Sequence, residues 1–322
     1  MQKKSHPIRM IAVDMDGTLL GPDGHVSPRN LNALHAAESA GIEVVVATGR
    51  RHCYAMRQLR GLGLREENAV ISSNGTVTRT IGAKLLERNL MQPHTARWLC
   101  SHIDEFRNAL VITFDMVGAD GEDARGSLVV EHLEELHGSI GKWMAANEPY
   151  IAHVVPIEKA LEAEAPIQMM VCGTIERMRR AETRLLEHPG VSAVGVNPQE
   201  HTSVEITLHR TEYPERNLSI VDILPAGCSK GSALLRLAAN RGLKAGEILA
   251  IGDNWNDVSM LEVAGQKVLM GNAPDDLKQT ALERGWTVGR RHDEDGVALA
   301  IEAVLAGQEY SPGIAAPMAS GR

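Results

Sequence analysis

Two aspartates, Asp14 and Asp16, interrupt the apolar run "IRMIAVDMDGTLL" near the start of the chain. In an extended strand, residues two apart point to the same side, so we expect both carboxylates to face one spot at the carboxyl end of a strand. Two like charges so close repel each other unless a cation lies between them or one is protonated. A hard divalent cation would meet this requirement, and a carboxylate can also attack phosphorus. The alternative is an ordinary turn or helix cap, because Asp-Gly is common in turns.

A second acidic pair lies late in the chain, in "ILAIGDNWND". Asp253 ends an apolar run, and Asp257 follows four residues later. If the turn between them is helical, both carboxylates face the same side. The alternative is a helix N-terminus, where Asp and Asn are favoured as caps.

Two further residues are placed to hold an anion. Thr48 follows the apolar run in "VVVATGR", where its hydroxyl and the nearby amides could bind a phosphate oxygen. Lys230 opens a predicted helix in "PAGCSKGSALL". A cation opposes the helix dipole at that end, which is explained if an anion and a carboxylate share the site. A plain turn at Thr48 and a solvated surface lysine at position 230 are the alternatives.

The elements that would position these residues alternate between strands and helices. The runs "IRMIAVD", "IEVVVATG" and "NAVISSNG" suit buried strands. A helix between the first two has Ser27 as its N-cap, Pro28 at its first position and Gly41 as its C-cap. The same alternation returns from about residue 228 onward. This pattern predicts the α/β class, with a doubly wound, Rossmann-like parallel sheet and right-handed crossovers.

The middle of the chain has a different pattern. Between about residues 85 and 224, strands follow one another with few helices, which suggests an inserted α+β domain with an antiparallel sheet. We therefore predict a discontinuous core of residues 1–84 and 225–306 and an inserted cap of residues 85–224. Residues 307–322 are rich in small residues, Pro and Gly, and are predicted to be a disordered tail.

Composition and charge exclude several classes of partner. The net charge is −8, which argues against a general affinity for nucleic acid or for an anionic membrane. The 4 cysteines are far apart in the sequence, so neither a zinc site nor a disulfide framework is expected. The chain contains no apolar signal core and no run of 18 apolar residues, and we expect a cytoplasmic protein.

Taken together, the motifs resemble those of a known family. "DMDGTLL", "ATGR", the lysine of "SKGSAL" and "GDNWND" occur in the order and spacing of the haloacid dehalogenase (HAD) superfamily of phosphohydrolases. The position of the insert resembles the Cof-type subfamily, which carries an inserted α/β cap that sets substrate specificity. The resemblance covers the whole chain except the tail.

The resemblance implies a role for each motif residue. Asp14 would be the nucleophile, and Asp16 would protonate the leaving oxygen and then activate water. Thr48 and Lys230 complete the implied catalytic set. The implied phosphate- and substrate-binding residues are Asp14, Thr48, Gly49, Asn74, Lys230 and Asn256.

The implied cofactor is Mg²⁺. Its ligands would be Asp14, Asp253 and the backbone carbonyl of Asp16, and Asp257 would support them from behind. We therefore expect a Mg²⁺-dependent phosphatase that acts on small phosphorylated metabolites, sugar phosphates above all, through an aspartyl phosphate, with neither nucleic acid nor membrane as a partner. A phosphomutase or phosphotransferase on the same fold and a non-catalytic regulator that binds metal and phosphate remain alternatives.

Overall fold

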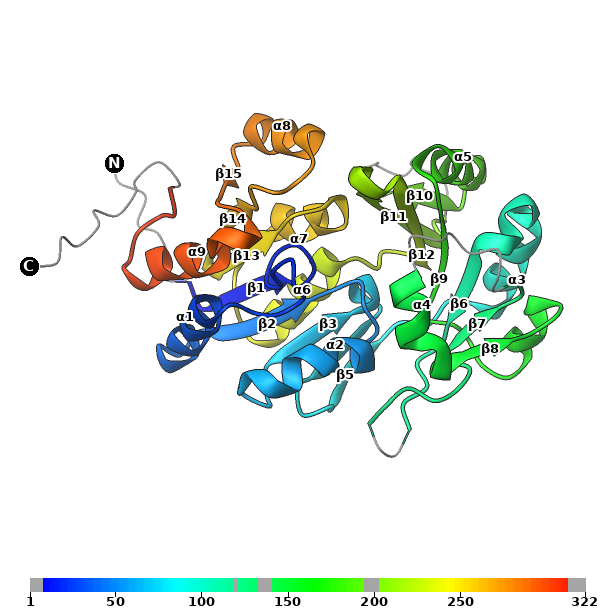
Figure 1. The fold of residues 1–322 in the computed structure, drawn as a ribbon, viewed down its shortest axis with the longest axis horizontal. Coiled ribbons are helices and arrows are strands. Elements are labelled where there is room, and N and C mark those ends of the chain that lie inside the picture. The colour runs from blue at the N-terminus through cyan, green and yellow to red at the C-terminus, as the bar shows by residue number, and fades with distance from the viewer. Residues whose placement is uncertain (1–7, 119–120, 133–140, 194–202, 312–322) are drawn as a thin grey trace, which may run out of the picture. The chain divides into compact units, whose positions relative to one another are not determined.

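The structure is a computed structural model that describes residues 8–118, 121–132, 141–193 and 203–311 (Figure 1). The chain forms two compact units. The first contains the residues up to Val46 and those from Leu235 onward, and the second runs from Ala47 to Leu234. The core and cap boundaries expected from the sequence, at residues 84 and 225, remain a prediction.

The first unit is built on a parallel sheet. Its strands follow the order β15-β14-β13-β1-β2, and β13 pairs in parallel with both β1 and β14. Every residue of β1 and of β13 is buried, which explains why both strands appear in the sequence as unbroken apolar runs. The predicted α/β class is confirmed. The strands are β1 (Met10–Asp14), β2 (Glu43–Ala47), β13 (Ile248–Gly252), β14 (Gln266–Leu269) and β15 (Thr287–Val288).

Helices follow these strands along the chain. They are α1 (Pro28–Ser39), α7 (Val258–Val263), α8 (Asp275–Glu283) and α9 (Gly296–Leu305), and α6 (Lys230–Asn240) leads from the second unit into the first. Ser27 caps α1 as predicted, because its side chain accepts a hydrogen bond from the backbone N–H of Asn30. The C-cap is Ala40, so the prediction of Gly41 was wrong by one residue. Gly41 follows with a φ of 81°, since the left-handed residue commonly stands just beyond the cap.

The second unit begins with a helix and a three-stranded antiparallel meander. Helix α2 (His52–Leu59) precedes β3 (Ala69–Ser72), which pairs antiparallel with β4 (Val77–Thr80). β4 in turn pairs antiparallel with β5 (Leu85–Arg88). Of these three strands, only β3 was predicted from the sequence.

A seven-stranded sheet forms the rest of the second unit. Its order is β10-β11-β12-β9-β6-β7-β8, and the pairs are antiparallel except for the outermost pair at each edge, β10 with β11 and β7 with β8. The expectation of an antiparallel sheet therefore holds for the interior pairs only. The strands are β6 (Leu110–Thr113), β7 (Leu128–Val130), β8 (Ile151–His153), β9 (Gln168–Gly173), β10 (Val191–Ala193), β11 (Ile206–Tyr213) and β12 (Leu218–Pro225).

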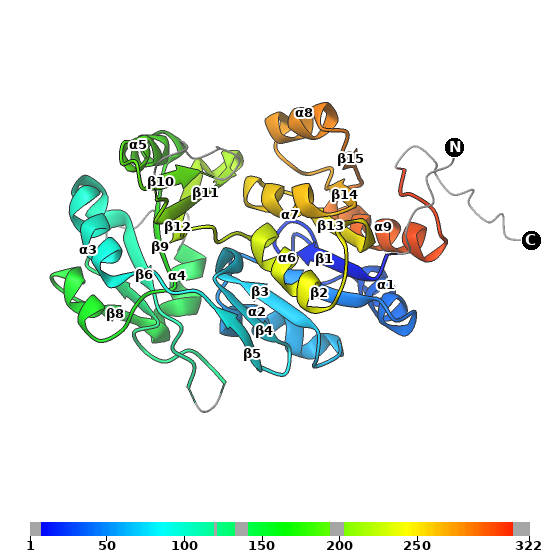
Figure 2. The ribbon, with the colours of Figure 1, turned by 180° about the vertical axis from the view of Figure 1, so that it is seen from behind.

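Helices cover both faces of this sheet. On one face lie α3 (Pro93–His102) and α5 (Ile175–Leu186) (Figure 2). They share an apolar core with the strands, in which Leu99 and Leu185 pack with Val221. On the other face, Trp143 and Met144 of α4 (Gly141–Asn147) pack against a second apolar cluster. α4 lies between β7 and β8 in the chain, and a crossover of this kind allows two strands to run in parallel.

Two further expectations concern the ends of the chain and the membrane. Most of the predicted disordered tail, residues 312–322, lies outside the described residues. Among the residues that the structure describes, no helix is long and apolar enough to cross a membrane.

Candidate active site

Three carboxylates converge in the first unit. Asp14, Asp253 and Asp257 each offer an oxygen that lies within 4.8 Å of the oxygens of the other two. Asp14 is the last residue of β1 and Asp253 directly follows β13, and these strands are neighbours in the parallel sheet. The carboxyl ends of parallel strands meet at one edge of the sheet, which is where open α/β sheets bind ligands.

The three carboxylates are suited to a divalent cation. All are buried, with exposed fractions of 4% for Asp14, 7% for Asp253 and 0% for Asp257. Buried like charges at this spacing repel unless a cation offsets them, and an all-oxygen donor set is what Mg²⁺ prefers. Oδ2 of Asp257 accepts the backbone N–H groups of Asp253 (2.9 Å) and Asn254 (3.0 Å). Asp14 and Asp253 are therefore better placed as direct ligands, with Asp257 holding the turn that carries Asp253.

The structure adds residues around Asp253 that the sequence analysis did not identify. Thr18 donates its hydroxyl to Oδ1 of Asp253 (3.0 Å), and Asn272 donates its amide to Oδ2 (3.3 Å) and to the carbonyl of Gly17 (2.8 Å). Gly17 has a φ of 81°, and a Cβ there would lie 2.4 Å from Oδ2 of Asp253. Asn272 comes shortly after β14. In the sequence, the one feature that could have indicated a role for Asn272 is that a polar residue stands at the carboxyl edge of the sheet.

The chain turns directly after Asp14. The N–H of Leu19 donates to the carbonyl of Asp14 (3.1 Å), and the N–H of Leu20 donates to that of Met15 (2.8 Å). The strand thus ends before Asp16, whose side chain is exposed. The side-to-side alternation of an extended strand does not reach this residue, so its role stays a prediction. The same holds for the half-buried Asn256, which lies in the short 3₁₀ helix Trp255–Asp257.

In the second unit, Thr48, Gly49 and Asn74 lie together. Thr48 is fully buried, and its Oγ1 accepts the N–H of Arg50 (3.1 Å), which leaves the hydroxyl hydrogen to be donated. The carbonyl of Thr48 accepts the N–H of Asn74 (3.1 Å). The carboxamide of Asn74 packs so close to Gly49 that a Cβ there would lie 3.3 Å from its nitrogen.

Lys230 is buried at the start of α6, with an exposed fraction of 0%. The alternative of a solvated surface lysine is therefore wrong. The helix start is capped by Ser229 and Ser232, each of which accepts the other's backbone N–H at 2.9 Å. The turn that carries Asn74 lies against this start, because a Cβ on Gly75 would be 2.1 Å from the carbonyl oxygen of Ser229. A buried cation, a hydroxyl and an amide in one region form a suitable setting for an anion.

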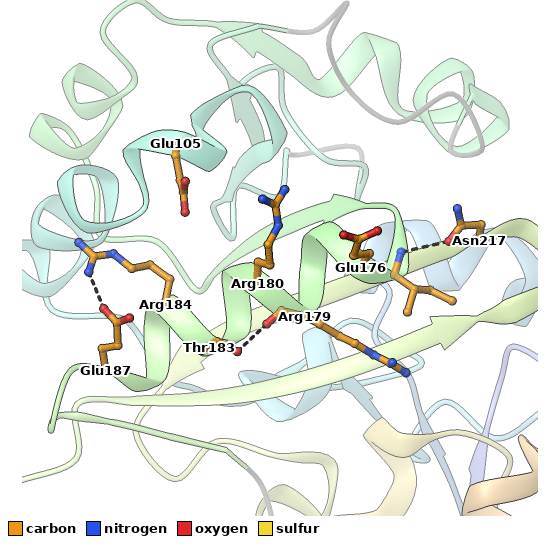
Figure 3. A pocket seen from close by; sticks show the side chains of 9 residues that line it. Glu105, Glu176, Arg179, Arg180, Thr183, Arg184, Glu187 and Asn217 are labelled. Carbon is orange, nitrogen blue, oxygen red and sulfur yellow. Dashed lines mark hydrogen bonds and ion pairs between the residues drawn. The ribbon is translucent and has the colours of Figure 1, made fainter.

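A separate hollow of about 690 Å³ lies on the second unit, along α5 (Figure 3). None of the predicted site residues lines it. Its charged side chains have both signs, and Arg184 forms an ion pair with Glu187 within it. The hollow is therefore distinct from the predicted site.

Comparison with known proteins identifies the family. A family model described as haloacid dehalogenase-like hydrolase matches residues 11–301. Phosphatase YwpJ of Bacillus subtilis (strain 168) is 30% identical over 319 residues, which cover 92% of this chain and 100% of YwpJ. The 5-amino-6-(5-phospho-D-ribitylamino)uracil phosphatase YwtE of the same organism is 28% identical over 315 residues, which cover 94% of this chain and 99% of YwtE.

A solved structure supports the same assignment. It is that of a haloacid dehalogenase-like hydrolase from B. subtilis, which superimposes with a TM-score of 0.67 at 27% identity and covers 92% of this chain and 99% of its own. The resemblance inferred from the motifs and the predicted enzyme class are both confirmed. The chain belongs to the haloacid dehalogenase-like hydrolases and is a phosphatase of that superfamily.

Proposed function

We propose that this protein is a Mg²⁺-dependent phosphatase of small phosphorylated metabolites, sugar and polyol phosphates above all, that works through an aspartyl phosphate on Asp14. The observation that carries the proposal is the convergence of Asp14, Asp253 and Asp257, whose oxygens lie within 4.8 Å of one another. A nucleophilic carboxylate next to a cation site is the arrangement that phosphoryl transfer requires.

Asp14, Asp253 and the backbone carbonyl of Asp16 would hold the ion, and Asp257 would support them. The bound ion supplies positive charge that offsets the carboxylates and the oxygens of the transferring phosphoryl group. On the substrate side, Thr48, Gly49, Asn74, Lys230 and Asn256 would hold the phosphoryl oxygens. Lys230 is a buried cation, and Thr48 and Asn74 offer hydrogen-bond donors, which suit the oxygens of a phosphoryl group.

The reaction proceeds in two displacements at phosphorus. An oxygen of Asp14 forms a bond to phosphorus while the ester oxygen leaves, and Asp16 gives that oxygen its proton. Asp16 then takes a proton from a water molecule as this water attacks the aspartyl phosphate. Inorganic phosphate leaves, Asp14 is again a free carboxylate, and Asp16 is again protonated for the next cycle.

The substrate class follows from two considerations. YwtE, which is 28% identical to this chain, is named for a substrate that carries a phosphorylated ribityl group. The large insert at residues 85–224, which we propose as the cap, would close over a small metabolite and exclude water from the site. A phosphoprotein or nucleic acid would not fit beneath such a cap.

The test is a panel of sugar and polyol monophosphates with Mg²⁺ present, followed by ³¹P NMR. We expect free phosphate to appear, to stop on addition of EDTA and to resume when Mg²⁺ is restored. An isomerised sugar phosphate without free phosphate would instead identify a phosphomutase. Asp14→Asn should release no phosphate in this assay, and Asp23→Asn is its matched control. Asp23 belongs to the same unit as Asp14, and its side chain is 74% exposed. Hydrolysis that persists in excess EDTA would contradict the proposal.

A further inference from the structure

A buried carboxylate that the proposed mechanism does not use lies in the seven-stranded sheet. Asp222 is on β12, and 6% of it is exposed. Its Oδ2 accepts the carboxamide nitrogen of Asn74 (2.9 Å), and its Oδ1 accepts that of Gln168. Both partners are donors, and an ionised carboxylate is an acceptor only, so the three side chains match in hydrogen-bonding character. Asp222 thus joins the sheet to the turn that carries Asn74.

That turn has an unfavourable backbone. Ser73, Asn74 and Gly75 have φ values of 47°, 52° and 97°, and residues other than glycine seldom occupy this region. Such a conformation persists only where surrounding contacts hold it. The contacts here include the N–H of Ser73 to the carbonyl of Arg50 (2.8 Å), the N–H of Asn74 to the carbonyl of Thr48 (3.1 Å), and the side-chain bond to Asp222.

The bond to Asp222 also determines which way the Asn74 carboxamide faces. With its nitrogen on the carboxylate, the carboxamide cannot turn over, because its oxygen would then face an oxygen of Asp222. Asn74 lies against Gly49, and Gly75 lies against Ser229 and Lys230. A rotated carboxamide would therefore change the hydrogen-bonding surface beside the residues assigned to phosphate.

We infer that Asp222, supported by Gln168, is a positioning residue that fixes the Asn74 carboxamide for phosphate binding. The inference rests on the proposed function, because it takes Asn74 as a phosphate ligand. Asp222 acts through Asn74 and does not touch the substrate. The seven-stranded sheet thereby contributes to phosphate binding through a buried side chain.

A double-mutant cycle tests this inference. The variants are Asp222→Asn, which is nearly isosteric, Asn74→Gly, which removes the side chain but tolerates the left-handed backbone, and the two combined. Glu212→Gln is the matched control, since Glu212 is a buried carboxylate (7% exposed) of the same sheet that pairs with Arg179 and Arg210. The measurements are kcat and KM for a sugar monophosphate, the affinity for inorganic phosphate with Mg²⁺ present, and the thermal unfolding midpoint.

We expect Asp222→Asn to lower both the affinity for phosphate and kcat/KM on the order of tenfold. The fall in kcat/KM should come mainly from a higher KM. In the Asn74→Gly background the same change should alter both by less than about twofold. Glu212→Gln should lower the unfolding midpoint without moving KM. Should Asp222→Asn fold poorly, Gln168→Leu removes one of the two donors and should shift KM in the same direction.

Additive effects of the two substitutions would overturn the inference, as would an unchanged KM and phosphate affinity in Asp222→Asn. Failure of the proposed function would look different, since the wild-type protein would then release no phosphate from any substrate. Phosphate affinity is measured without turnover, so the cycle still decides whether Asp222 acts through Asn74. A wild-type protein that binds no phosphate would also overturn the inference.

Discussion

The hydroxyl of Thr18 donates a hydrogen bond to Oδ1 of Asp253 at 3.0 Å, although the two residues are 235 positions apart in the chain. The bond fixes the orientation of a proposed metal ligand. Thr18→Val keeps the shape and removes the donor, so the affinity for Mg²⁺ should fall on the order of tenfold, as is usual when a residue behind a metal ligand is lost. The measurement is the Mg²⁺ concentration that gives half-maximal phosphatase rate. Thr18→Ser, which keeps the hydroxyl, should resemble the wild type, and equal Mg²⁺ requirements in all three proteins would refute the assignment.

Asp14→Asn should have opposite effects on activity and on stability. Removing the nucleophile should lower kcat by at least roughly 1,000-fold. Without metal, however, neutralising one of three crowded carboxylates relieves repulsion, so the free energy of unfolding should rise by on the order of 1 kcal/mol. Phosphate release and urea unfolding in EDTA measure the two effects. A variant that still turns over at a tenth of the wild-type rate would exclude Asp14 as the nucleophile.

Gly17 and Gly24 form a matched pair in the first unit. Both have a positive φ, 81° and 79°, but a Cβ on Gly17 would lie 2.4 Å from Asp253, whereas a Cβ on Gly24 would meet nothing within 4 Å. Gly24→Ala should lower the free energy of unfolding by about 1 kcal/mol through backbone strain alone. Gly17→Ala adds a steric clash of about 1–3 kcal/mol and displaces Asp253, so activity should fall as well. Equal losses in the two variants would show that the clash is relieved elsewhere.

Asp222 should give stability a distinctive pH dependence. Burial raises its pKa to about 7, although the hydrogen bonds from Gln168 and Asn74 and the charge of Lys230 act in the opposite direction. A titratable residue on the neighbouring strand, His209, is opposite Asp222 on β11. Between the unfolded pKa of 3.8 and about 7, the folded state binds more protons than the unfolded state.

The free energy of unfolding should therefore decline as the pH rises through this window. The part that comes from Asp222 is on the order of 4 kcal/mol, and it is fully lost above pH 7. Asp222→Asn replaces the carboxyl group with an amide that does not titrate. The difference between the wild type and the variant in the free energy of unfolding, measured by urea unfolding, should therefore change steadily from pH 4.5 to 7.5. A difference that stays constant over this range would show that the carboxyl group does not titrate there.

Two arginines pair with the carboxylate of Asp115, and they allow a buried ion pair to be compared with a more exposed one. Arg79 binds Asp115 through two hydrogen bonds of 2.8 Å, and their side chains are 9% and 6% exposed. Arg88 reaches the same carboxylate at 3.4 Å with a side chain that is 35% exposed. Arg79→Met should lower the free energy of unfolding by about 3 kcal/mol, because the buried Asp115 carboxylate would lose its two short hydrogen bonds and keep the longer contact with Arg88. Arg88→Met should cost less than about 1 kcal/mol, and a larger loss there than at Arg79 would contradict this ranking.

The parts of the structure that could be predicted from the sequence have strong local signals. β1 and β13 are buried on both faces, so they appear as apolar runs, and Asp14 and Asp253 stand where those runs stop. Parallel pairing of these strands then brings the two carboxylates together. By contrast, β5 is mostly exposed and carries charges, and its sequence "LLER" has neither an alternating nor a continuous apolar pattern.

Residues that act through tertiary contacts had no such signal. Asp222 is a single acid within the apolar run of β12, with no spaced partner in the sequence, and its partners Asn74 and Gln168 come from distant segments. Asn272 likewise has meaning only through Gly17 and Asp253. The direction of the Asp16 side chain could not be predicted from strand alternation for a related reason. The strand ends before Asp16, and backbone hydrogen bonds of the following turn set the path of the chain there.

The chain passes from one compact unit to the other only twice, after Val46 and after Leu234. The first passage lies two residues before Thr48, and the second lies four residues after Lys230. Both passages lie inside regular elements, because Val46 belongs to β2 and Leu234 belongs to α6. Each is therefore held by backbone hydrogen bonds close to a residue of the proposed phosphate site. An insertion or deletion at either passage would break the hydrogen-bond pattern of a strand or a helix, so natural variation in length should accumulate in the loops.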